Sequence, residues 1–216
     1  MKKIRGVIFD LDGTLANTLP LCIQAFRQSV EPLIQRALSD TEIIATFGPS
    51  EEGTIMALAP DHYDKGVTDY LHYYEDLHDM CPVAFDGIKE LLDALKDNGV
   101  RIAMVTGKGK YSTDISLRYF ELTHYFELLE TGSPKGARKA EGIQVILDDW
   151  NGVPKNEVIY VGDAPSDIIA SRKAGIPVIA AAWAETAEPE KLIELEPDEI
   201  FYSVEEFSTW IQQKIY

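Results

Sequence analysis

The sequence predicts an α/β protein with a parallel sheet and an all-helical segment inserted after the first strand. From residue 83 onward, short apolar runs alternate with amphipathic stretches, as expected for strands joined by crossover helices. Between residues 16 and 82, apolar residues instead recur at three- and four-residue spacing, and no convincing strand is present. We therefore expect residues 1–15 and 83–216 to form a Rossmann-like α/β core, and residues 16–82 to form a helical cap domain.

The first strand ends in two closely spaced carboxylates. Val7-Ile8-Phe9 is an unbroken apolar run, which suits a strand covered on both faces, and Asp10 and Asp12 follow it. They lie where a parallel strand ends, at the edge of an open α/β sheet where ligands usually bind. Gly13 comes next and allows close backbone approach to an anion. The alternative interpretation of this stretch is an ordinary Asp-Gly turn.

The remaining elements follow from periodicity and from turn residues. Leu19, Ile23, Phe26 and Val30 predict the first cap helix. Further cap helices are expected at residues 40–47, 51–58 and 63–78. In the core, helices are predicted at residues 88–96, 113–120, 141–150 and 165–174, and strands at residues 100–105, 125–129, 158–161, 177–181 and 200–202. A capping box at residues 203–206 precedes a last amphipathic helix.

Composition narrows the choice of partners and compartment. The 216 residues include 36 acidic and 20 basic side chains, a formal net charge of −16, which argues against nucleic acid or an anionic membrane surface as a partner. The apolar run near the N-terminus is too short for a signal peptide, and no stretch is long enough to span a bilayer. Cys22 and Cys81 form neither a disulfide framework nor a metal motif. We expect a cytoplasmic protein, either a monomer or a homodimer.

The ends of three predicted strands carry polar groups of different kinds. Asp10, Thr106 and Asp163 each follow an apolar run, and parallel strands bring their carboxyl ends to one edge. Carboxylates at this density suit Mg²⁺, a hard cation that prefers oxygen ligands. A cation is also needed if carboxylates are to meet a phosphate, because two like charges about 4 Å apart repel by about 4 kcal/mol at an intermediate dielectric. The sequence therefore predicts a magnesium site at this edge.

The chain carries four short motifs: Asp10-Leu11-Asp12-Gly13-Thr14-Leu15, then Val105-Thr106-Gly107, a lysine near residue 139, and Gly162-Asp163-Ala164-Pro165-Ser166-Asp167. With these motifs the sequence resembles the haloacid dehalogenase (HAD) superfamily of phosphatases. They occur in the order of the family, in the expected strand contexts, over essentially the whole chain. The helical insert looks like the cap of the phosphoglycolate phosphatase-like and β-phosphoglucomutase-like branch.

This resemblance implies opposite roles for the two neighbouring carboxylates. Asp10 would attack phosphorus and form an aspartyl-phosphate, and Asp12 would protonate the leaving alcohol and then activate water. Thr106, which would bind a phosphoryl oxygen, and Lys139 would complete the catalytic set. Dehalogenases of the family lack a carboxylate at the position of Asp12, because their leaving group needs no proton. The chain is therefore expected to transfer phosphoryl groups.

The resemblance also implies a metal site and an anion site. Asp10, Asp163 and the carbonyl oxygen of Asp12 would hold Mg²⁺. Asp167 would be a further acid of this site, holding a metal-bound water or orienting the lysine. Asp163 and Asp167 could instead be ordinary residues of a helix start, where Asp is favoured. The residues expected to bind the phosphoryl group are Gly13, Thr106, Gly107 and Lys139.

The identity of the functional lysine stays open between two candidates. Lys135 and Lys139 both lie near the expected position, and Ala140 stands where relatives often have proline. Lys139 is preferred because it immediately precedes a predicted helix. For either lysine, an exposed surface charge is the alternative interpretation.

The cap loop at residues 47–52 carries acids where a lysine or arginine would have indicated a second anionic group on the substrate. Ser50 in this loop is expected to be a helix N-cap, and His78 near the end of the cap is expected to be structural.

These observations favour a Mg²⁺-dependent phosphatase that hydrolyses a small phosphomonoester, phosphoglycolate-like or another organic phosphate, through an aspartyl-phosphate. The alternative is a sugar-phosphate mutase of the β-phosphoglucomutase type. A non-catalytic protein that binds phosphorylated metabolites is a third alternative.

Overall fold

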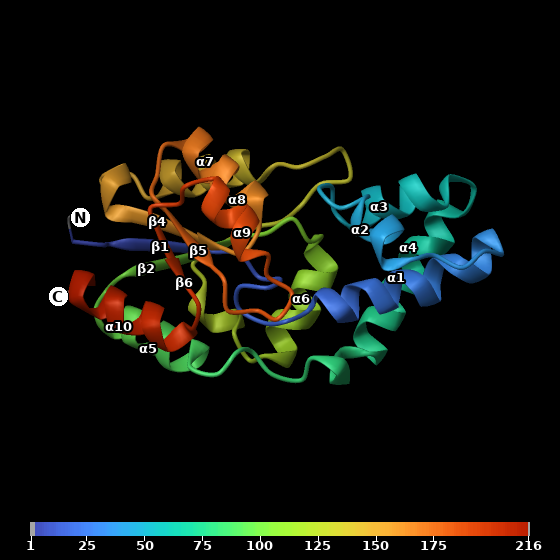
Figure 1. Ribbon diagram of the computed structural model, residues 1–216, viewed down its shortest axis with the longest axis horizontal. Coiled ribbons are helices and arrows are strands. Elements are labelled where there is room, and N and C mark those ends of the chain that lie inside the picture. Colours follow the sequence, from blue (N-terminus) through green and yellow to red (C-terminus); the bar gives the residue numbers. More distant parts are fainter. Residues whose placement is uncertain (1–2, 216) are drawn as a thin grey trace.

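A six-stranded parallel sheet forms the centre of the α/β part (Figure 1). The computed structural model describes residues 3–215. The strand order is β3-β2-β1-β4-β5-β6, so the first strand is central. The strands are β1 (Gly6–Phe9), β2 (Arg101–Val105), β3 (Leu128–Glu130), β4 (Val158–Gly162), β5 (Val178–Ala181) and β6 (Glu199–Phe201). The predicted fold class is confirmed.

Helices cover both faces of this sheet. The helices of the α/β part are α5 (Ile88–Asp97), α6 (Lys110–Tyr119), α7 (Lys139–Asp149), α8 (Pro165–Ala174), α9 (Pro189–Glu194) and α10 (Val204–Ile215). In Figure 1, α5 and α10 lie on one side of the sheet, and α7 and α8 on the other. Alternate side chains of β1 point to opposite faces of the sheet. Phe9 belongs to the apolar cluster that includes Phe207 of α10, and Ile8 belongs to the apolar cluster that includes Ile168 of α8. This double burial explains the continuous apolar run.

Between β1 and α5, the described chain forms helices and no strand. These elements are α1 (Leu19–Ile34), α2 (Asp40–Ile44), α3 (Glu51–Leu58), α4 (Tyr63–Asp76) and the short 3₁₀ turns Pro60–His62 and His78–Met80. Aromatic packing joins α1 to α4, since the ring centroids of Phe26 and Tyr70 are 4.3 Å apart. Figure 1 shows this helical group beyond one end of the sheet. Domain limits at residues 15/16 and 82/83 stay a prediction.

Local details differ from the sequence-based expectation in a few places. The strand predicted at residues 125–129 starts later, as β3, because residues Thr123–Tyr125 form a 3₁₀ turn in which the amide of Tyr125 donates to the carbonyl of Leu122 at 3.1 Å. In the predicted capping box, the Ser203 hydroxyl accepts the Glu206 amide at 3.1 Å, but the Glu206 carboxylate accepts the amide of Tyr202. Helix α6 begins at Lys110, and α9 was not predicted.

Within residues 3–215, none of the helices combines the length and the apolar character that crossing a bilayer requires.

Candidate active site

The carboxyl ends of β1, β2 and β4 open into a cavity of about 480 Å³ that the helical group also borders. From the α/β part, the cavity is lined by residues that include Asp10, Asp12, Gly13, Thr106, Gly107, Lys139 and Asp163. Seven of the eight residues singled out from the sequence therefore lie around one space. Asp167, the eighth, is fully buried just behind it. This clustering follows from the parallel topology, which brings the strand ends to a common edge.

Asp10 follows β1 directly and is only 4% exposed. One of its carboxylate oxygens accepts the amide of Leu11 at 2.7 Å, and the other is paired with the ammonium of Lys139. Burial raises the pKa of Asp10 to about 6; Lys139 opposes this rise, whereas the neighbouring carboxylates of Asp167 and Asp12 add to it. The side chain is thus held in place, with its charge only partly compensated.

Asp163, at the end of β4, lies within reach of Asp10. Oxygens of Asp10, Asp163 and Asp167 all lie within 4.8 Å of one another. Burial, followed by the charges of Asp167 and Asp10, raises the pKa of Asp163 well above its usual value. Its carboxylate accepts a hydrogen bond from the hydroxyl of Thr14, at 3.1 Å. The carboxylates of Asp10 and Asp163 are close together and their negative charge is only partly balanced, which fits a divalent cation with oxygen ligands.

Gly13 makes the close approach of the two loops possible. Its φ of +74° lies in the left-handed region, and a Cβ atom there would collide with the carboxylate of Asp163. A larger residue would therefore push the β1 loop away from the β4 loop.

Asp167 lies behind the other two acids and anchors Lys139. Its carboxylate contacts the Lys139 ammonium at 2.5 Å, and it also accepts the hydroxyl of Tyr160 at 3.0 Å and the amide of Ala164 at 2.9 Å. Burial disfavours the charge on Lys139, but Asp10 and Asp167 outweigh it and raise the pKa of Lys139. Both oxygens of Asp167 therefore already have donors from the protein.

Thr106 and Gly107 form the loop after β2. Thr106 is 2% exposed, and its hydroxyl accepts the amide of Lys108 at 3.2 Å. The carbonyl of Gly107 packs so tightly against Gly132 that a Cβ atom on Gly132 would collide with it. Two loops are therefore pressed together beside the cavity.

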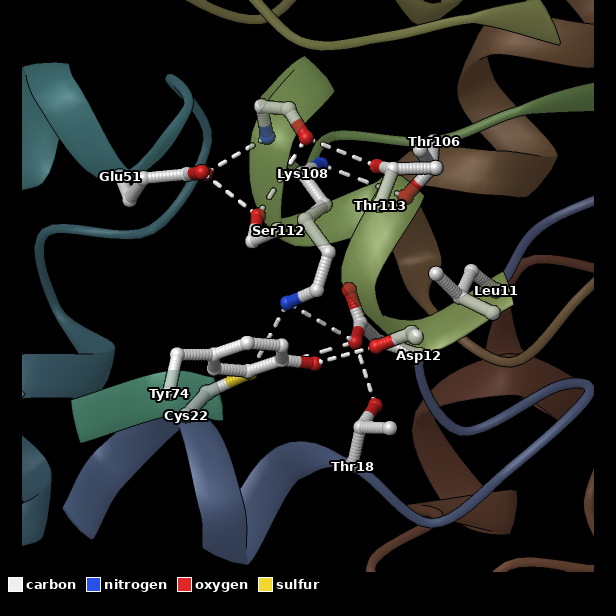
Figure 2. Close-up of polar contacts among 12 residues, drawn as sticks. Leu11, Asp12, Thr18, Cys22, Glu51, Tyr74, Thr106, Lys108, Ser112 and Thr113 are labelled. Atoms are coloured by element: carbon white, nitrogen blue, oxygen red, sulfur yellow. Dashed lines mark hydrogen bonds and ion pairs between the residues drawn. The ribbon is translucent and has the colours of Figure 1, made fainter. Parts of the chain in front are cut away.

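The carboxylate of Asp12 points toward a lysine that the sequence reasoning did not single out (Figure 2). The ammonium of Lys108 lies 3.2 Å from Asp12 and 3.1 Å from the sulfur of Cys22, and the hydroxyl of Thr18 donates to the same oxygen of Asp12. Lys108 also lies 4.4 Å from the centre of the Tyr74 ring. Burial disfavours its charge, but Asp12, Cys22, Tyr74 and Tyr70 together outweigh this effect, and the pKa of Lys108 is raised. The sequence signal that could have identified Lys108 is its position two residues after Thr106.

Glu51, the first residue of α3, is a second residue whose contacts the sequence did not reveal. Glu51 is 5% exposed, and its carboxylate accepts the amide of Gly109 at 2.6 Å and the hydroxyl of Ser112 at 2.5 Å (Figure 2). Gly109 and Ser112 lie at the N-terminus of α6, where a negative charge is favoured. Glu51 thus links the helical group to the α/β part beside the cavity.

Three other residues considered from the sequence lie apart from these contacts. Lys135 is exposed, and its amide donates to the hydroxyl of Ser133 at 3.2 Å. His78 is fully buried, 3.2 Å from the hydroxyl of Ser116. Ser50 occupies the N-cap position of α3, but its hydroxyl donates to Glu52 instead of capping the helix.

The fold and the comparisons with known proteins together define an α/β hydrolase. Residues 7–181 match the sequence profile of the haloacid dehalogenase-like hydrolases, and the chain belongs to this family. Pyrophosphatase PpaX of Bacillus pumilus is 30% identical over 197 residues, which cover 90% of each chain. The family predicted from the sequence is confirmed, and the chain is a phosphatase of this family, a hydrolase that acts on phosphate esters.

Solved structures share the fold over nearly the whole chain. A haloacid dehalogenase-like hydrolase from Streptococcus pneumoniae superposes with a TM-score of 0.77 at 25% identity, covering 97% of this chain and 99% of that one. A "predicted phosphoglycolate phosphatase" from Haemophilus somnus gives a TM-score of 0.79 at 22% identity and covers 99% of both chains. The second likeness concerns the fold alone.

Proposed function

We propose that this protein is a Mg²⁺-dependent phosphatase that hydrolyses a small phosphomonoester through an aspartyl-phosphate. The observation that carries the proposal is the grouping of Asp10, Asp163 and Asp167 within 4.8 Å at the carboxyl ends of β1 and β4. Three acids in this position create a strongly negative site, with Lys139 paired to two of them. Such a site suits a cation and, together with it, a phosphate.

The carboxylates of Asp10 and Asp163 are the side chains that would hold Mg²⁺, with the carbonyl oxygen of Asp12 as a further ligand. A magnesium ion supplies charge stabilisation to the phosphoryl group when it is bound. Asp167 acts through Lys139 in this proposal, because its own oxygens are engaged by Lys139, Tyr160 and Ala164.

The chemical steps use the two carboxylates of the β1 loop. A carboxylate oxygen of Asp10 attacks phosphorus, and the bond between phosphorus and the ester oxygen breaks. Asp12 gives its proton to that oxygen, which leaves as an alcohol. Asp12 then takes a proton from water, whose oxygen attacks phosphorus and releases phosphate and the free Asp10 carboxylate.

The remaining residues bind the transferred group. In this proposal the hydroxyl of Thr106, the backbone amide of Gly107 and the ammonium of Lys139 contact phosphoryl oxygens. Preorganised donors of this kind usually make the largest contribution to such reactions. The amide of Gly13, expected from the sequence to bind the phosphoryl group, instead donates to the carbonyl of Ala16 at 2.8 Å. Lys139 is the chosen lysine because it contacts Asp10, whereas Lys135 is exposed.

The test is hydrolysis of a panel of phosphorylated metabolites with and without Mg²⁺, in the wild type and in Asp10→Asn. We expect phosphate release that depends on Mg²⁺ and falls at least about a thousandfold in Asp10→Asn, because the nucleophile is lost. Asp97→Asn, a substitution of an exposed acid on α5, is the matched control and keeps wild-type activity. Full activity of Asp10→Asn would refute the mechanism.

The same assay separates the other candidates. An isomerised sugar phosphate with little free phosphate would identify a mutase, and a lack of turnover of every compound would favour a binding protein. Pyrophosphate belongs in the panel because the Bacillus pumilus relative is named a pyrophosphatase.

A further inference from the structure

The helical group contributes an apolar wall to the cavity. Six of its residues on this wall are Leu19, Phe26, Ile44, Phe47, Pro49 and Tyr70. Among the residues of this group that line the cavity in the described structure, none is a lysine, arginine or histidine. A second phosphate or carboxylate of a substrate would therefore find no cationic partner on this side.

The cations on the opposite side already have anionic partners. Lys139 is paired with Asp10 and Asp167, and Lys108 is paired with Asp12. The side chain of Lys108 is only 3% exposed and is enclosed by Cys22 and the ring of Tyr74.

Lys173, at the rim of the cavity, lies 3.2 Å from Glu141. A second anion would have to compete with a carboxylate for any of the three lysines that line the cavity, Lys108, Lys139 and Lys173.

Glu51 places a fixed negative charge on the wall that the helical group contributes. Its carboxylate is held by Gly109 and Ser112 and cannot rotate away without losing both hydrogen bonds. A Cβ atom on Gly109 would lie 2.6 Å from this carboxylate, which shows how closely the two segments are fitted. A second anionic group of a substrate would meet like charge here.

Three large apolar side chains border the cavity and are nevertheless exposed. Phe47 is 38% exposed, Ile44 43% and Ile169 of α8 59%. Phe47 packs on Phe26, with ring centroids 5.9 Å apart, so Phe26 helps to hold the Phe47 ring in position. Apolar surface at the edge of a polar cleft is favourable for binding an apolar group, because binding removes that surface from water.

We propose that the substrate is a phosphomonoester of an uncharged alcohol with an apolar face, and that Phe47 and Glu51 determine this specificity. Phe47 contacts the organic group, and Glu51 disfavours substrates that carry a second anionic group, such as pyrophosphate and phosphoglycolate. This inference rests on the phosphatase function proposed above.

The first experiment compares kcat/KM for benzyl phosphate with that for phosphoglycolate and pyrophosphate, in the presence of Mg²⁺. Benzyl phosphate and phosphoglycolate are both esters of primary alcohols, so the comparison reports mainly on recognition. We expect benzyl phosphate to be preferred at least about tenfold over either anionic compound. A higher kcat/KM for phosphoglycolate or pyrophosphate would overturn the inference and leave the proposed phosphatase function intact.

Two substitutions test the specificity residues. Glu51→Gln should lower the ratio of kcat/KM for benzyl phosphate to kcat/KM for phosphoglycolate about tenfold, since the substitution removes the negative charge that repels the carboxylate of phosphoglycolate. Glu52→Gln, which changes the neighbouring acid outside the cavity lining, should leave this ratio unchanged.

Phe47→Ala should lower the ratio of kcat/KM for benzyl phosphate to kcat/KM for methyl phosphate about tenfold. Met56→Ala, which changes an exposed apolar residue of α3, should leave this second ratio unchanged. Unchanged ratios in both Glu51→Gln and Phe47→Ala would contradict the assignment.

Binding measured by calorimetry separates this inference from the catalytic proposal. Benzylphosphonate and phosphonoacetate cannot be hydrolysed by the same reaction, and we expect benzylphosphonate to bind at least about tenfold more tightly. Tighter binding of benzylphosphonate without turnover of any ester would support the recognition and refute the phosphatase. Tighter binding of phosphonoacetate by an active enzyme would refute the recognition alone.

Discussion

The carboxylates of the site differ because their immediate surroundings differ. Asp10 is paired with Lys139, and Asp12 with Lys108, so each carboxylate of the β1 loop has its own ammonium partner. Asp163 has the hydroxyl of Thr14 as its hydrogen-bond donor. Among these three acids, Asp163 is therefore the one whose charge gains most from a bound cation.

Asp163→Asn is expected to stabilise the metal-free protein at pH 8. The pKa of Asp163 is raised in the folded state, so the folded protein is favoured at low pH and loses this advantage as the pH rises through the folded pKa. A neutral amide of the same shape removes the free-energy cost of burying the ionised Asp163 carboxylate. Thermal unfolding should show a higher Tm for the variant without metal, by a few degrees, since about 1 kcal/mol changes the Tm of a chain this size by about 2–4 °C.

Added Mg²⁺ provides the control for this prediction. We expect Mg²⁺ to raise the Tm of the wild type and to have much less effect on Asp163→Asn, because a ligand stabilises the state that binds it. A lower Tm for the metal-free variant, or equal effects of Mg²⁺ on both proteins, would contradict the assigned role.

At the scale of elements, small residues allow the helical group and the α/β part to approach closely. The amide of Ser50 donates to the carbonyl of Ser133 at 3.0 Å, and a Cβ atom on Gly53 would lie 2.7 Å from the carbonyl of Pro134. Glu51 and Gly109 continue this contact. The cap loop is therefore fitted against loops that follow β2 and β3, which fixes the apolar wall relative to the carboxylates of Asp10 and Asp12.

A second contact between the two parts is sensitive to pH. His78 is buried beside Ser116 of α6, and its ring stacks on Tyr119. Burial lowers the pKa of His78, and the nearby charge of Lys108 lowers it further, whereas Asp79 opposes the change. The unfolded chain therefore binds a proton more readily than the folded chain, and stability falls as the pH drops below about 6.5.

His78→Gln should reduce this loss of stability between pH 7 and pH 5. The contribution of one histidine is at most about 1.4 kcal/mol per pH unit, and urea unfolding at several pH values measures it. His72→Gln is the matched control, because His72 on α4 is exposed and pairs with Asp76. Identical pH dependence in the wild type and His78→Gln would show that this histidine does not titrate on unfolding.

For the whole molecule, the net charge of −16 acts against the compact state. Salt screens this repulsion, since the Debye length falls from about 30 Å at 0.01 M to about 10 Å at 0.1 M ionic strength. We expect the Tm at pH 8 to rise by a few degrees over this range of NaCl. The rise should become smaller at pH 5, where carboxylates begin to take up protons, and a Tm that falls with salt at pH 8 would contradict the expectation.

The sequence by itself determined the fold class and the edge of the sheet at which the candidate site lies. Strand and helix periodicity are local properties of the chain, and parallel strands place Asp10, Thr106 and Asp163 at one edge whatever the details of the loops. Element boundaries were less predictable: a strand was expected at residues 125–129, but a 3₁₀ turn occupies residues 123–125 and β3 covers residues 128–130.

Only the tertiary structure decided which charged groups meet inside the cavity. Lys139 and Asp10 are separated by 129 residues, and Gly109 and Glu51 by 58, so their contacts depend on how the loops and the helical group pack. Spacing in the sequence favoured Lys139 over Lys135 but did not show that it lies between Asp10 and Asp167. The pairing of Lys108 with Asp12 had no counterpart in the sequence reasoning, because a buried ion pair needs partners from separate elements to be desolvated together.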